Sequence, residues 1–151
     1  MVEEGIMEEK LELVVHIHKD AAMGVYTTKT LMDKLKDKDN KIKSYVEEIH
    51  KKYEEYVEKS KSILLDHDIH PEEDGMVSKM MASMGISKEV KDDNSDSAIS
   101  DLLIQGISMG VIEMEKKLKS YSDECDKEYI KLAKDFMKFQ EKTIDELKKY
   151  L

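Results

Sequence analysis

The sequence has no tryptophan, no arginine, one proline and one cysteine among its 151 residues, and these scarcities exclude several classes of protein. The single cysteine, Cys125, excludes an intramolecular disulfide and is typical of a reducing compartment. A net charge of −9 without arginine leaves neither the basic surface nor the guanidinium forks that favour nucleic-acid binding. One proline and six glycines give few turn signals, which favours long helices over a many-stranded sheet.

What is abundant is charge, at 39% of the residues, beside a hydrophobic content of 40%. A chain of this length and composition predicts one soluble domain spanning residues 1–151. Its longest apolar region, residues 102–112, is too short to cross a bilayer. The first residues are acidic, whereas an export signal begins with positive charge. We therefore expect a cytoplasmic protein with neither a nucleic-acid nor a membrane partner.

Four stripes of apolar residues recur at spacings of three and four, the period of an amphipathic helix. They predict an all-α four-helix bundle, and the fourth stripe, for example, contains Tyr129, Phe136, Gln140 and Thr143. The four helices are expected at about residues 6–36, 41–67, 96–121 and 123–150.

The connection between the second and third helices, residues 68–95, is much longer than the other two and determines the predicted topology. It can run back along the second helix, so that the third helix starts beside the start of the second. Within it, Met76, Met80 and Met84 recur every four residues, which predicts a short Met-rich amphipathic helix packed on the bundle.

A resemblance to a known family rests on two segments. One is the glycine-containing crossover, Asp74-Gly75-Met76-Val77-Ser78, and the other is the third helix with Gly106, Gly110, Met114 and Leu118. This pattern resembles a bacterial ferritin-like four-helix-bundle family of unknown function. The resemblance implies a bundle with one crossover and no particular activity.

The motif Glu47-Glu48-Ile49-His50 matches half of a di-iron site, in which two helices supply Glu-x-x-His and two supply one Glu each. Ile49, however, lies near the centre of the apolar face of this helix. At about 100° per residue, Glu47 lies roughly 160° away from Ile49, on the opposite side. The fourth helix has no Glu-x-x-His. The complete di-iron ligand set is therefore absent, and Glu47 is expected on the solvated face.

A different polar cluster is predicted from helix heights. In the crossover topology His18, Tyr56 and Glu113 come to roughly the same level, where they could hold a single transition-metal ion or transfer a proton. The alternative is a buried hydrogen-bond network that fixes helix register. Asp20 is predicted at the rim of this level and His16 on the surface.

Three functions remain open from the sequence. We expect a non-catalytic module that associates with itself or with another helical protein. The alternative is an atypical metal-binding or redox bundle that uses His18, Glu113 and Tyr56. The third is binding of a small apolar ligand between the helices. Cys125 is predicted to be a small buried hydrophobe, because its acidic neighbours oppose thiolate formation.

Overall fold

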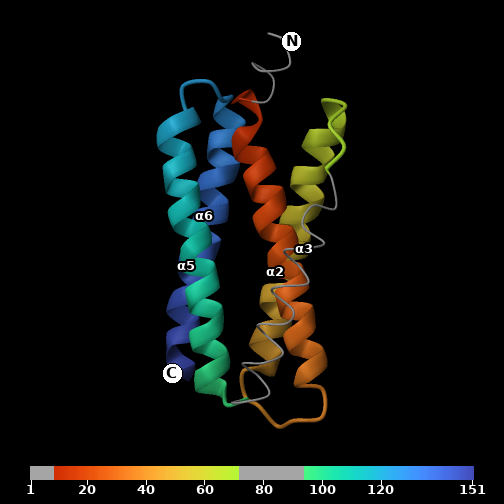
Figure 1. Cartoon of the computed structure of the whole chain (residues 1–151), viewed down its shortest axis with the longest axis vertical. Coiled ribbons are helices and arrows are strands. Elements are labelled where there is room, and N and C mark those ends of the chain that lie inside the picture. The colour runs from red at the N-terminus through yellow and green to blue at the C-terminus, as the bar shows by residue number, and fades with distance from the viewer. Residues whose placement is uncertain (1–8, 72–93) are drawn as a thin grey trace.

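The computed structural model describes residues 9–71 and 94–151, and within them the protein consists of helices without a strand (Figure 1). The elements are α2 (Glu12–Lys34), α3 (Lys43–Asp66), α5 (Asp96–Tyr121), α6 (Lys127–Leu147) and the short 3-10 helix η1 (Lys148–Tyr150). For this part of the chain, the prediction of an all-α bundle of four helices is confirmed. The predicted Met-rich helix and residues 6–8 of the first predicted helix lie outside the described residues.

Helix boundaries follow local capping. Helix α5 starts at the predicted residue, because the Ser95 hydroxyl accepts a hydrogen bond from the Ala98 amide at 3.1 Å. Helix α6 starts at Lys127, four residues later than predicted. Residues 122–126 form the turn between α5 and α6, and Asp126 has an extended backbone with ψ near 149°. The acids before α6 therefore belong to this turn, not to the first helical turn.

The chain forms two hairpins, α2 with α3 and α5 with α6 (Figure 1). The turn after α2 holds the start of α5. The Asn40 side-chain amide donates to the Asn94 carbonyl at 2.8 Å and to the Asp96 carboxylate at 3.0 Å. As predicted from the length of the connection, α5 therefore begins beside the start of α3, and these two helices point the same way.

The core is built from the predicted stripes. Phe136 of α6 is completely buried at its centre, and its ring lies 4.8 Å from that of Tyr56 and 6.1 Å from that of Tyr53, both on α3. The Ser100 hydroxyl of α5 donates to the Leu147 carbonyl at the end of α6. Aromatic packing thus joins the two hairpins in the middle, and a polar contact fixes one end.

Candidate functional site: a buried polar cluster

Polar side chains from three helices meet inside the bundle at Gln140 of α6. The fully buried Gln140 donates through Nε2 to Asp20 Oδ2 of α2 at 2.9 Å and to the Tyr53 hydroxyl of α3 at 3.1 Å. Both amide hydrogens are used, as expected for a buried amide. Gln140 oxygen Oε1 is buried and has no hydrogen-bond partner among the described residues.

Two glycines bring the backbones close enough for this cluster to form. A Cβ atom at Gly24 would lie 2.6 Å from Cγ and Cδ2 of the Tyr53 ring, and one at Gly110 would overlap the Asp20 carboxylate. Gly24 therefore admits Tyr53 against α2, and Gly110 admits Asp20 against α5. Asp20 fills the room at Gly110, and no atom lies within 4 Å of a Cβ placed at Gly106.

His16 lies one turn before Asp20 on α2 and extends the cluster. Burial lowers the pKa of His16, and the charge of Lys117 lowers it further. Asp20, a hydrogen bond with the Gly110 backbone and Glu113 act in the opposite direction and favour the protonated form. Its Nε2 atom is buried without a hydrogen-bond partner in the described part of the chain. The prediction of a surface position for His16 was therefore wrong.

Burial also dominates the electrostatics of Asp20 and Tyr53. It raises the pKa of the Asp20 carboxyl, against the opposing effects of the Gln140 hydrogen bond and the charge of His16. Burial raises the pKa of the Tyr53 phenol as well, and the charge of Asp20 adds to it, so Tyr53 stays neutral. Asp20 is thus part of the core network and not only a rim residue as predicted.

Replacing Asp20 with asparagine is expected to stabilise the protein at neutral pH by about 1 kcal/mol. A carboxyl whose pKa is raised by folding contributes stability that is complete below its ordinary value of 3.8 and lost as the pH rises through the folded value. Asparagine removes this loss. Urea unfolding at several pH values from acidic to neutral would measure the difference in the free energy of unfolding between the variant and the wild type. This difference should become smaller as the pH falls. A gap of constant size would contradict this origin.

The three predicted ligands lie in different surroundings. Tyr56 is 5% exposed and its ring packs on Phe136 and Phe139, whereas Glu113 is exposed, 3.6 Å from Lys116 of its own helix. His18 is half-buried on α2. Across residues 9–71 and 94–151, no group of three or more His, Cys, Asp or Glu side chains is placed to hold a metal ion. A metal centre at His18, Glu113 and Tyr56 stays a prediction.

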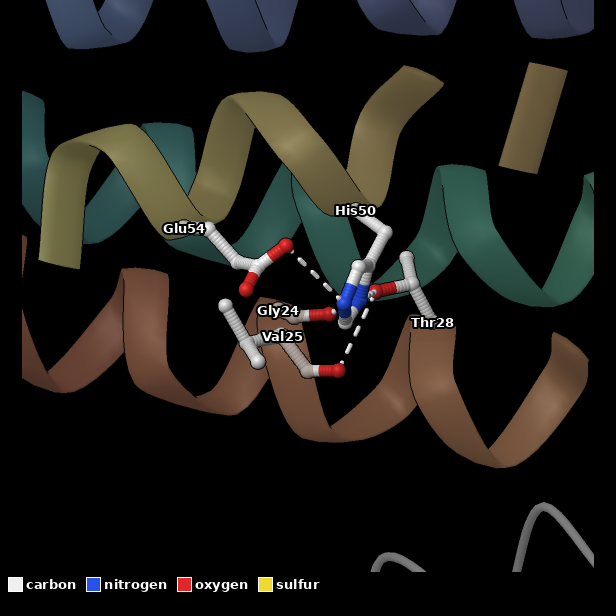
Figure 2. Close-up of polar contacts among 5 residues, drawn as sticks. All are labelled: Gly24, Val25, Thr28, His50 and Glu54. Atoms are coloured by element: carbon white, nitrogen blue, oxygen red, sulfur yellow. Dashed lines mark hydrogen bonds and ion pairs between the residues drawn. The ribbon is translucent and has the colours of Figure 1, made fainter. Parts of the chain in front are cut away.

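The two side chains of the Glu47-x-x-His50 motif lie in different surroundings, and Glu47 is on the solvated face as its helical phase predicted. Glu47 is exposed, whereas His50 faces α2, with Nδ1 2.9 Å from the Thr28 hydroxyl and Nε2 3.2 Å from the Glu54 carboxylate (Figure 2). Thr28 donates to the Gly24 carbonyl at 2.7 Å, so its oxygen is available to accept from His50. His50 therefore acts as a link between α2 and α3.

His16 and Asp20 were the residues of this cluster that sequence reasoning misplaced. Both lie off the apolar stripe of α2, and this stripe is the pattern from which the buried face of the helix is predicted. The signal that could have found them is the spacing of His16, Asp20 and Gly24, which places all three on one line along the helix. A small residue on that line indicates a close neighbouring helix.

The chain matches no protein-family model, no curated protein and no solved structure. Over the described residues, the fold and the site define an all-α bundle of four helices whose core contains a hydrogen-bonded polar cluster.

Proposed function

We propose that this protein is a non-catalytic helical module that self-associates through the outer face of α5, on a frame of the ferritin-like kind. The observation that carries the proposal is residues 102–112, eleven consecutive positions without a charged side chain in a chain that is 39% charged. By length and composition α5 is also the one helix among the described residues that could span a membrane. Packing in the bundle accounts for one side of this apolar helix, and a partner would account for the other.

The outer stripe of α5 consists of Asp101, Gln105, Met109, Ile112 and Lys116. Their spacings of four, four, three and four keep them on one helical face. Met109 is 68% exposed and Ile112 is 51% exposed, and both rank among the few large hydrophobic side chains that the described surface exposes. Adjacent exposed apolar residues of this kind are typical of an interaction site.

Charges at the two ends of the stripe favour a second copy of the chain as the partner. In an antiparallel pair related by a twofold axis between residues 108 and 109, Asp101 of each copy lies opposite Lys116 of the other. Ile112 then lies opposite Gln105, and the two Met109 side chains lie beside the axis. The rest of the surface carries the net charge of −9, so this stripe is where two copies meet with little repulsion.

Replacing Met109 with glutamate is expected to weaken self-association at least 100-fold, because the symmetry would bury two carboxylates side by side. Sedimentation velocity over a range of concentrations should give twice the chain mass of 17.5 kDa for the wild type and the single mass for the variant. The matched control is Leu65→Glu on α3, where a 43% exposed leucine gives way to the same charge.

Three outcomes would contradict the proposal. One is a wild-type protein that remains a monomer at high concentration, and another is a Met109→Glu variant with unchanged mass. The third is a protein that co-sediments with lipid vesicles and releases them when Met109 becomes glutamate, which would make a membrane the partner of this face.

A further inference from the structure

A small cavity of about 90 Å³ lies beside the polar cluster, between α2, α3 and α5. Its volume corresponds to roughly three water molecules or a chain of a few heavy atoms. The apolar part of its wall comes from Met23 of α2 and from Leu102, Leu103 and Ile107 of α5. The cavity therefore suits a short aliphatic group better than an extended polar ligand.

Among the described residues that line this cavity, Asp20 is the charged one. Its carboxylate accepts a hydrogen bond from Gln140, and the positive charge that acts on it comes from His16, whose own pKa is lowered by burial. A carboxylate at an apolar wall is stable only when it is protonated or compensated by a positive charge. A ligand of this cavity must therefore fit its shape and also bring a positive charge to Asp20.

Gln140 is the hydrogen-bond donor that the described residues provide to Asp20. The Gln140 amide donates its two hydrogens to Asp20 and Tyr53, and its own oxygen is buried without a partner among the described residues. A ligand with several N–H groups supplies what this neighbourhood lacks, whereas an anion would add a further acceptor.

We propose that the cavity binds a short-chain primary ammonium ion, with its ammonium group on the Asp20 carboxylate and its alkyl chain between Met23 and the α5 leucines. The ammonium supplies both the positive charge and the donors, and the alkyl chain matches the apolar wall. This site is independent of the proposed self-association.

Titration of the full-length, isotope-labelled protein with n-propylammonium, followed by amide NMR shifts, tests this assignment. A ligand of four heavy atoms is expected to bind with a dissociation constant of about a millimolar or somewhat less. Resonances of α2 and α5 around the cavity should shift and saturate. The neutral isostere 1-propanol and the tetramethylammonium ion, which has no N–H group, should each bind at least tenfold more weakly.

Two variants test separately the charge of Asp20 and the free volume of the cavity. Asp20→Asn keeps the shape of the side chain and should weaken binding at least tenfold, whereas Asp33→Asn, on an exposed position of the same helix, should leave it unchanged. Gly106→Leu should abolish binding by filling the cavity, since Gly106 lines it and a Cβ there meets no atom within 4 Å.

The proposal is overturned if propylammonium gives no saturable shift, if 1-propanol binds equally well, or if Asp20→Asn binds like the wild type. It is also overturned if Gly106→Leu retains binding, because the ligand would then lie elsewhere. Asp20→Asn is expected to fold at least as well as the wild type, so loss of binding in that variant reports on the carboxylate and not on unfolding.

Discussion

Replacing Gly24 with alanine is expected to lower the free energy of unfolding by about 3 kcal/mol. The added Cβ would lie 2.6 to 2.7 Å from three carbons of the Tyr53 ring, where real Cβ contacts are not found. Tyr53 is 3% exposed, its ring meets Phe136 and Phe139 edge-on, and its hydroxyl accepts a hydrogen bond from Gln140. The ring cannot withdraw without disturbing this packing.

Gly106→Ala is the matched control for this substitution. Gly106 also lies within a helix, but a Cβ there meets no atom within 4 Å, so helix propensity alone should raise stability by about 0.5 to 1 kcal/mol. Urea unfolding followed by circular dichroism measures both changes, on the Met109→Glu background so that association does not contribute. Equal effects of the two substitutions would contradict the close approach of α2 and Tyr53.

A double-mutant cycle tests whether the clash is with Tyr53 itself. If Tyr53 is replaced with leucine, the space beside Gly24 opens, and the further substitution Gly24→Ala should cost much less than it does in the wild type. Additive effects of the two substitutions would place the cost of Gly24→Ala elsewhere.

The helices and their order could be predicted from the sequence, because they depend on local patterns. The period of the apolar residues identified α2, α3, α5 and α6. The length of residues 68–95 gave the direction of α5 relative to α3. Gln140 was also found, since it lies on the apolar stripe of its own helix.

The composition of the polar cluster could not be predicted in the same way. Asp20 and Gly110 are 90 positions apart, and their contact depends on how closely α2 and α5 approach, which periodicity does not specify. Helical phase alone placed Asp20 off the core face. Because Gly110 has no side chain, Asp20 can lie against α5 inside the core. Burial there raises the pKa of Asp20 and lowers the pKa of His16.

Asp101→Lys is expected to weaken self-association by about 30-fold. A twofold interface contains each contact twice, so this substitution turns two attractive pairs with Lys116 into two repulsive ones. At about 1 kcal/mol for each pair, the change is roughly 2 kcal/mol. Asp33→Lys, on an exposed position of α2, changes the net charge equally and should leave the dissociation constant near its wild-type value. Equal weakening by both would indicate general repulsion.

The most direct test of association through α5 is sedimentation of an equimolar mixture of Asp101→Lys and Lys116→Asp. In the antiparallel pairing each variant repels itself, yet a mixed pair places lysine opposite aspartate at both ends of the stripe. At a concentration where each variant alone sediments as a single chain, the mixture should sediment at the mass of two chains. A mixture that sediments as single chains, while the wild type sediments as a pair, would contradict this interface.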